Sequence, residues 1–190
     1  MKIAFVMFDN FTFLDLIGFY DCITRLKTMG FKQDLSWDMC ALSETVSDDR
    51  GLSVNATKVN TKLDCYDLLF IPGGMGTRTL QHDYSFINWI KTGKEIQLKV
   101  SVCTGSLILG AAGFLKDKKA TTHPNAFKEL DPYCLNVEKE RIVDEGSVIT
   151  GGGVTSSIDL GLYLCERLSS SEIRNQITTQ MDYPYGLQSI

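Results

Sequence analysis

One cysteine, Cys103, stands where a buried strand gives way to a helix. The segment LKVSVCTGSLILGAAGFL, residues 98–115, runs from a short apolar strand through a Cys-Thr-Gly-Ser turn into an apolar helix. This layout, a nucleophile elbow, projects a side chain at the carboxyl end of the strand, where open α/β sheets bind ligands. We expect the helix dipole and its free N–H groups to lower the pKa of the thiol, because the thiolate is the attacking species. The alternative is that Cys103 only packs beneath the helix.

A glycine-rich turn is the second segment that could take part in chemistry. IPGGMGTRTL, residues 71–80, follows a buried strand, and consecutive glycines let a backbone approach a ligand closely. The N–H groups of Gly73 and Gly74 could complete an oxyanion hole facing the elbow, together with those of Thr104 and its neighbour Gly105. The plainer alternative is a tight turn.

A cysteine nucleophile also needs a proton carrier, and two residues are candidates. Asp15 interrupts the apolar stretch TFLDLIGF, where a buried carboxylate is costly unless it has a task or a partner. Its alternative role is that of a structural aspartate at a helix start. His123 ends an expected strand on the same side as the elbow, and could equally cap the turn at Pro124. The other histidine, His82, lies in a polar turn and is expected to be exposed.

Strand-like and helix-like segments alternate along most of the chain. Runs rich in β-branched and aromatic residues are followed by segments whose apolar residues recur at the helical period. This alternation predicts an α/β fold in which a mostly parallel sheet is covered by helices on both faces. We expect strands at 2–8, 35–43, 67–71, 98–102, 118–122, 137–143 and 147–150, helices at 11–29, 83–94, 107–115, 125–130, 155–168 and 171–180, and a hairpin or edge ribbon within 44–59.

Composition narrows the classes of protein. A net charge of −4 argues against nucleic acid or an anionic membrane as a partner, because both need a concentrated positive field. No apolar stretch reaches the ~20 residues of a membrane-spanning helix, and the first residues lack the pattern of a secretory signal. The six cysteines are scattered without zinc-ligand spacing, which favours a reducing, cytoplasmic compartment and no metal site. Without a repeat or linker, residues 1–190 are expected to form a single domain.

Several ordered motifs together make the sequence resemble the ThiJ/PfpI family of the class I glutamine-amidotransferase-like superfamily, and particularly its isonitrile hydratase branch. The resemblance covers nearly the whole chain. Its motifs are FDNFTFLDLIGFYD, LLFIPGGMGTR, VSVCTGSLILGAAGFL, KATTHPNAF, ERIVDEGSVITGGGVTSSIDLGLYLCERL and QMDYPYG.

The resemblance implies a flavodoxin-like three-layer α/β/α sandwich, usually a homodimer, that acts on a small molecule and needs no cofactor or metal. It implies that Cys103 is the reactive group and that Asp15 and Thr104 belong to the active site. The reaction implied for that branch has the Cys103 thiolate adding to an isonitrile carbon while Asp15 handles the proton. Water then releases an N-substituted formamide, so that one difficult addition becomes two easier steps.

The sequence also departs from parts of the family. Protease-like members have a histidine directly after the cysteine, where this chain has Thr104, and the late histidine and glutamate of the glutaminase members are absent from VTSSIDLGLYL. Isonitrile hydratase carries an aromatic residue after the histidine of the TTH motif, where this chain has Pro124. The alternatives are a glyoxalase or deglycase, a protease or amidase, and a non-catalytic redox sensor or chaperone in which Cys103 is oxidised. No DNA-reading module is expected.

Overall fold

A seven-stranded sheet forms the centre of the molecule. The computed structural model describes residues 1–184, so the last residues of the QMDYPYG motif, Tyr185 and Gly186, lie outside the described part. All neighbouring strands are parallel except β10, which runs antiparallel to β11. The strand order is β10 (Ile142–Asp144), β11 (Val148–Gly151), β7 (Leu98–Val102), β6 (Leu68–Ile71), β1 (Lys2–Val6), β2 (Ser36–Ala41) and β5 (Lys58–Val59).

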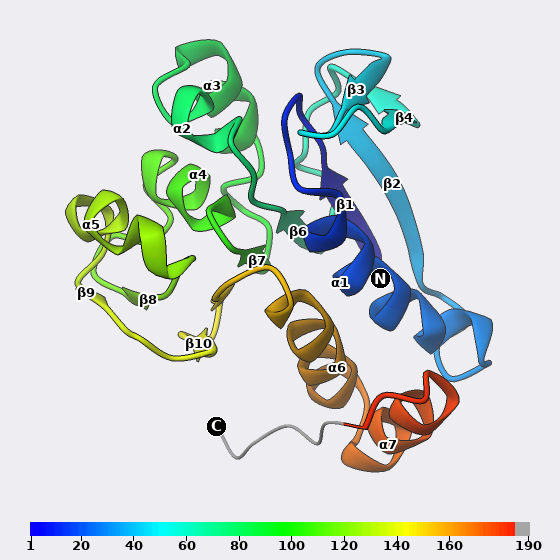
Figure 1. Ribbon diagram of the computed structural model, residues 1–190. Coiled ribbons are helices and arrows are strands. Elements are labelled where there is room, and N and C mark those ends of the chain that lie inside the picture. Colours follow the sequence, from blue (N-terminus) through cyan, green and yellow to red (C-terminus); the bar gives the residue numbers. More distant parts are fainter. Residues whose placement is uncertain (185–190) are drawn as a thin grey trace.

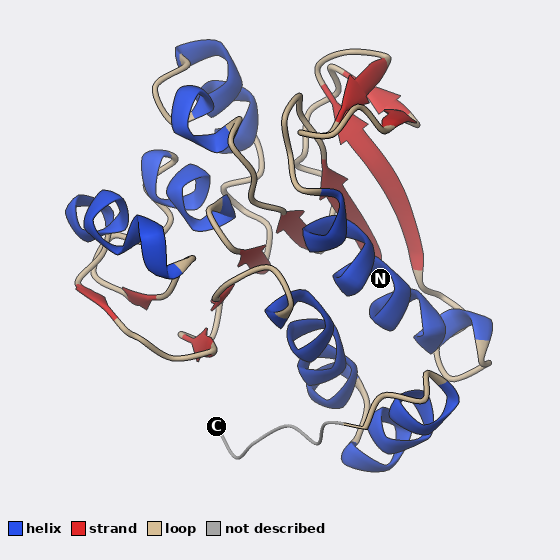
Figure 2. Cartoon of the chain, viewed as in Figure 1, coloured by secondary structure: helices blue, strands red, loops and turns tan. Residues whose placement is uncertain are grey.

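Helices cover both faces of this sheet, which confirms the predicted three-layer sandwich. Figure 1 shows α1 (Phe13–Thr28), α6 (Ser156–Leu168) and α7 (Ser171–Gln180) on one side. The other side carries four shorter helices, and the colouring in Figure 2 separates both helical layers from the strands between them. Those four are α2 (Thr77–Leu80), α3 (Tyr84–Lys91), α4 (Gly105–Ala111) and α5 (Phe127–Leu130), with 3₁₀ turns η1 (Pro124–Ala126) and η2 (Asp131–Tyr133) beside α5.

The central strands are buried because both of their faces are covered. Every residue of β6 and β7 is buried, as a parallel strand between two helical layers requires. Three phenylalanines join α1 to the sheet: the Phe19 and Phe70 rings stack with centroids 4.1 Å apart, and Phe5 meets both edge-on. This contact fixes α1, and with it the start of the helix, over the middle of the sheet.

Two short ribbons lie outside the main sheet. β3 (Thr45–Ser47) and β4 (Ser53–Asn55) pair as an antiparallel hairpin, which confirms the ribbon expected within 44–59. β8 (Lys119–Ala120) is a shorter form of the strand expected at 118–122, and it pairs with β9 (Asn136–Val137). The single strand expected at 137–143 was predicted wrongly, because β9 and β10 are separate strands there. The charged run 138–141 explains the break, because these residues remain outside the core between β9 and β10. The helix expected at 107–115 instead begins at Gly105 and ends at Ala111.

Among residues 1–184, no helix is long and apolar enough to cross a bilayer.

The stacked phenylalanines give a test of the packing. Phe19→Ala removes a fully buried ring, and we expect the free energy of unfolding to fall by about 3–5 kcal/mol. Chemical denaturation measures this change. Tyr84→Ala is the matched control, because the Tyr84 side chain is 82% exposed and its loss should change stability by no more than about 0.5 kcal/mol. Equal effects of the two changes would contradict this account of the core.

Candidate active site

Cys103 lies at the sharp turn between β7 and α4, as the nucleophile-elbow layout predicts. Its φ of 54° is in the left-handed region, which for a residue with a side chain is strained and must be held by surrounding contacts. The Cys103 N–H donates to the carbonyl oxygens of Gly151 (3.0 Å) and Gly152 (2.7 Å). The Cys103 carbonyl oxygen accepts from Thr122 Oγ1 at 2.9 Å and from Ser106 Oγ at 3.2 Å. Both the N–H and the carbonyl oxygen of Cys103 are therefore hydrogen-bonded, which holds the turn in place.

Glycines make room for this turn. A Cβ on Gly105 would lie 2.3 Å from the Ile71 carbonyl oxygen, so the elbow rests directly on the end of β6. A Cβ on Gly73 would lie 2.6 Å from the Thr104 nitrogen, 2.7 Å from the Cys103 Cβ and 2.8 Å from Asp15 Oδ2. Asp15, Cys103 and Thr104 therefore surround the position that a Cβ of residue 73 would occupy, so only a glycine fits there.

The Asp15 carboxyl group is fully buried and has few partners. Its Oδ2 accepts a hydrogen bond from the Gly73 N–H at 2.9 Å, while Oδ1 has no partner among residues 1–184. Burial raises the pKa of Asp15 to about 7; the Gly73 N–H and the nearby Cys103 thiol oppose this shift, and the Asp49 carboxylate adds to it. A carboxyl group with a pKa near 7 can accept and return a proton at neutral pH.

The Cys103 thiol is protonated at rest, contrary to the pKa lowering expected from the helix. Burial, first, and the negative charge of Asp15 raise the pKa of Cys103 to about 12. The N–H and hydroxyl of Thr104 favour the thiolate but do not outweigh burial. Only 5% of Cys103 is exposed, so its place at the start of α4 does not offset the effect of burial. A thiolate can therefore form readily only if Asp15 takes the proton.

The glycine loop uses its N–H groups differently from the expected oxyanion hole. The Gly73 N–H is bonded to Asp15, and the Gly74 N–H donates to Thr104 Oγ1 at 3.0 Å. The Thr104 hydroxyl lies 3.1 Å from the Gly74 carbonyl oxygen, to which it donates. Neither glycine N–H is free for a developing negative charge. The loop instead orients the carboxyl group and the threonine.

His123 is at the rim rather than among these groups. Its Nδ1 accepts from the Asn125 N–H at 3.2 Å and so caps η1, which favours the capping alternative. The ring lies against the loop at Gly153, which continues the segment that binds the Cys103 N–H. Within residues 1–184 it makes no hydrogen bond to Cys103 or Asp15. His82 is exposed, as expected.

The sequence interpretation missed the segment that anchors the glycine loop. The Thr12 N–H donates to the Gly73 carbonyl oxygen at 2.9 Å, and the Gly76 N–H donates to that of Asn10 at 3.0 Å. Asn10 has a φ of 61°, a conformation that asparagine tolerates better than most residues. An asparagine four residues after the end of β1 was the available signal. In the described part of the chain, no group of three or more His, Cys, Asp or Glu side chains could hold a metal ion.

The residues of this site lie in a part of the chain that matches a known protein family. The sequence pattern of the DJ-1/PfpI family matches residues 1–167, which include every group described above. The chain belongs to the DJ-1/PfpI family. The predicted resemblance to ThiJ/PfpI proteins is thereby confirmed.

Individual DJ-1/PfpI relatives extend this result. Isonitrile hydratase of Pseudomonas putida is 33% identical over 185 residues, which cover 96% of this chain and 78% of that protein. The HTH-type transcriptional regulator CdhR of Pseudomonas aeruginosa is 30% identical, and the match covers 92% of this chain but only 55% of the regulator. A crystal structure of a ThiJ/PfpI family protein from Pseudomonas syringae superposes with a TM-score of 0.88 at 29% identity, over 99% of this chain and 77% of that one.

The raised pKa of Asp15 predicts a pH-dependent stability. Its folded pKa of about 7 exceeds the ordinary unfolded value, so the contribution is present below about pH 4 and is lost as the pH rises to 7. Relative to Asp15→Asn, the wild type should lose about 2–4 kcal/mol of unfolding free energy over this range. Denaturation at a series of pH values measures the difference. Asp64→Asn, at an exposed position, should follow the wild type; a constant difference between Asp15→Asn and wild type would contradict the assigned shift.

Proposed function

We propose that this protein is a cysteine-dependent hydratase that converts an isonitrile into an N-substituted formamide. The observation that carries the proposal is the placement of Asp15, Cys103 and Thr104 around Gly73, with a carboxyl pKa near neutrality beside a protonated thiol. The similarity to the isonitrile hydratase of Pseudomonas putida supports the choice of substrate class.

In the first step, the proton of the Cys103 thiol passes through Asp15 to the substrate. Asp15 takes the proton of the Cys103 thiol while the sulfur bonds to the terminal isonitrile carbon, and the Asp15 carboxyl then donates that proton to the same carbon. The product of this step is a thioimidate, R–N=CH–S–, on Cys103. The Thr104 N–H stabilises the sulfur while it carries negative charge, because this backbone group favours the thiolate, whereas the Thr104 hydroxyl proton is held by the Gly74 carbonyl oxygen.

The second step adds water and frees the enzyme. Asp15 accepts a proton from water as the oxygen bonds to the thioimidate carbon, and the nitrogen receives that proton. The carbon–sulfur bond then breaks, the sulfur regains a proton from the new hydroxyl group, and R–NH–CHO leaves. The sum is one isonitrile and one water giving one formamide, with no oxidant or reductant.

The burial of the thiol weighs against the sensor alternative. Peroxide oxidises thiolates selectively when they are exposed and have a low pKa, whereas Cys103 is buried and its pKa is raised. The catalytic proposal needs only a transient thiolate, which the adjacent carboxyl group supplies. The same geometry therefore supports addition chemistry better than reversible oxidation.

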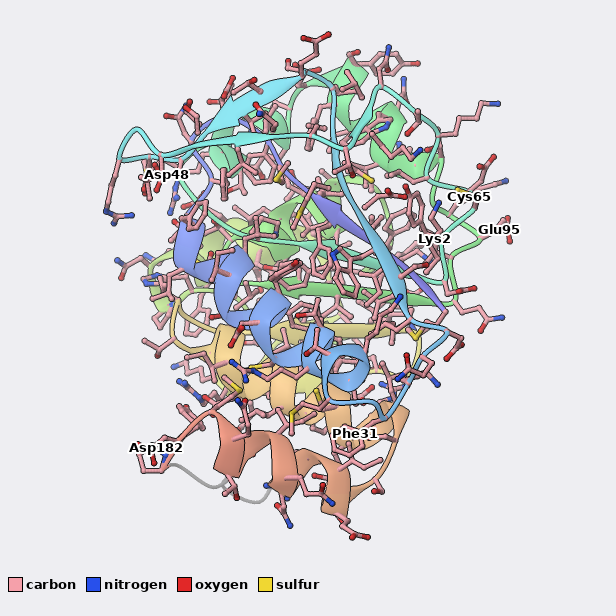
Figure 3. The ribbon with its side chains drawn as sticks, turned by 90° about the vertical axis from the view of Figure 1, so that its right-hand side faces the viewer. Lys2, Phe31, Asp48, Cys65, Glu95 and Asp182 are labelled. Carbon is pink, nitrogen blue, oxygen red and sulfur yellow. The ribbon has the colours of Figure 1, made fainter. Side chains whose placement is uncertain are left out.

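Formamide production tests the proposal directly. Cyclohexyl isocyanide incubated with the protein should yield N-cyclohexylformamide, measured by chromatography. Cys103→Ser should abolish turnover, and Asp15→Asn should lower kcat by about 10²–10⁴-fold. The control is Cys65→Ser, because Cys65 is exposed and precedes β6, whereas the glycine loop follows β6. Figure 3 shows Cys65 on the side of the molecule opposite to Asp48. No product at high enzyme concentration would refute the substrate class.

The pH profile tests the role of Asp15. The carboxyl group must be ionised to accept the thiol proton, so kcat/KM should rise about tenfold per pH unit below pH 7 and level off above it. Kinetics between pH 5 and 9 measure the inflection. In Asp15→Glu, which keeps a titratable group, a displaced inflection should remain, whereas Asp15→Asn should show none. An unchanged acid limb in Asp15→Asn would remove Asp15 from this role.

A further inference from the structure

A cavity separate from the Cys103 site lies at the carboxyl ends of β1 and β2. Its volume is about 290 Å³, near the lower end of the ~300–1,000 Å³ of ordinary ligand pockets. The segments that follow β1 and β2 line it, together with α2, α3 and the residues before them. Neither Cys103 nor Asp15 is among the lining residues.

The strand order places this cavity where open α/β sheets bind ligands. From β1 the chain proceeds to β2 on one side, while β6 lies against the other side of β1. The strand order therefore reverses at β1, and open α/β sheets bind ligands outside the carboxyl ends of the strands at such a switch point. The loop after β1 forms a wall of the cavity.

The lining combines apolar and polar side chains, and two of the polar residues are aspartates. Phe8 and Phe86, whose ring centroids are 5.7 Å apart, and Val46 are almost fully buried, so the half-buried Leu42 and Leu80 supply the accessible apolar surface. Asp9 and Asp83 also line the cavity, and both are exposed. No lining residue of this cavity is lysine, arginine or histidine.

Neither carboxylate is neutralised by a cation of the protein. Asp9 Oδ1 accepts from the Ser47 N–H at 2.9 Å, and Asp83 Oδ1 accepts from the Phe86 N–H at 3.0 Å. Within residues 1–184, neither aspartate takes part in an ion pair. Each carboxylate is thus oriented by one backbone hydrogen bond and lies beside apolar side chains of the lining. This combination is complementary to a cation that carries a hydrocarbon group.

We propose that this cavity binds a small organic ammonium ion, with its hydrocarbon or aromatic part against Leu42 and Leu80 and its nitrogen held by Asp9 and Asp83. The site is distinct from the catalytic groups but shares a wall with them. Gly76, which lines the cavity, is bonded to the Asn10 carbonyl oxygen and belongs to the same glycine loop that holds Asp15. Binding itself does not depend on the proposed reaction.

Titration of the full chain with 2-phenylethylammonium chloride tests the site. Amide signals of Asn10, Val46 and Gly76 in ¹H–¹⁵N spectra should shift and saturate, with a dissociation constant of about 10 mM or tighter for this nine-heavy-atom ligand. Neutral 2-phenylethanol and anionic 3-phenylpropanoate should bind at least about fivefold more weakly. The Cys103→Ser protein should bind the ammonium ion equally well, which separates this site from the catalytic one.

Charge-removing variants supply the second arm. Asp9→Asn and Asp83→Asn keep an oxygen acceptor for the Ser47 and Phe86 N–H groups, and asparagine caps a helix as well as aspartate does. Each should weaken binding by about two- to fivefold, while the exposed control Asp64→Asn should not.

Thr79→Phe, which places a ring at the exposed mouth of the cavity, should weaken binding further. Three results would each overturn the proposal: equal affinity for the alcohol, unchanged affinity in both asparagine variants, or shifts confined to residues around Cys103.

Discussion

A buried carboxyl group with too few hydrogen bonds determines the properties of the candidate active site. Asp15 is excluded from water and receives one N–H bond, from Gly73, so its ionised form is poorly stabilised. Its affinity for a proton is therefore high, and its charge in turn makes ionisation of Cys103 harder. The two groups behave as a coupled pair, in which forming a thiolate means moving a proton across a short gap rather than releasing it to solvent.

The coupling between Asp15 and Cys103 requires the turns that follow β6 and β7 to approach each other very closely. β6 and β7 are adjacent parallel strands, so the turns that follow them meet at one edge of the sheet. Gly73 and Gly105 allow those turns to touch, and α1 brings Asp15 to the same place from the other side of the contact. The aromatic stack between α1 and β6 holds that helix in position. A core interaction thus determines where a reactive carboxyl group lies.

Local signals in the sequence predicted the elements and the identity of the central groups. An apolar run ending in Cys-Thr-Gly-Ser is sufficient to indicate an elbow at Cys103, and an acid within the apolar stretch TFLDLIGF indicates a buried Asp15. The direction of the thiol's pKa could not be predicted from the sequence, because it depends on how deeply the elbow is covered and on a carboxyl group from a distant segment. The partners of the Gly73 and Gly74 N–H groups depend in the same way on tertiary contacts. The break within 137–143 reflects competition between β-propensity and charge, which periodicity alone does not resolve.

The interlocked loops also restrict which positions around the candidate site can change. The backbone around Gly73 is in van der Waals contact on several sides, so insertions or larger residues there would separate the reacting groups. The side chains of Leu14 and Met75, which flank Asp15 and Gly74 in the sequence, are instead 46% and 61% exposed. Variation at such outward-facing positions changes the surface beside the site without disturbing the packing of Asp15 and Gly73. Sequence diversification within this architecture is therefore expected to proceed through the surface side chains while the reactive framework stays unchanged.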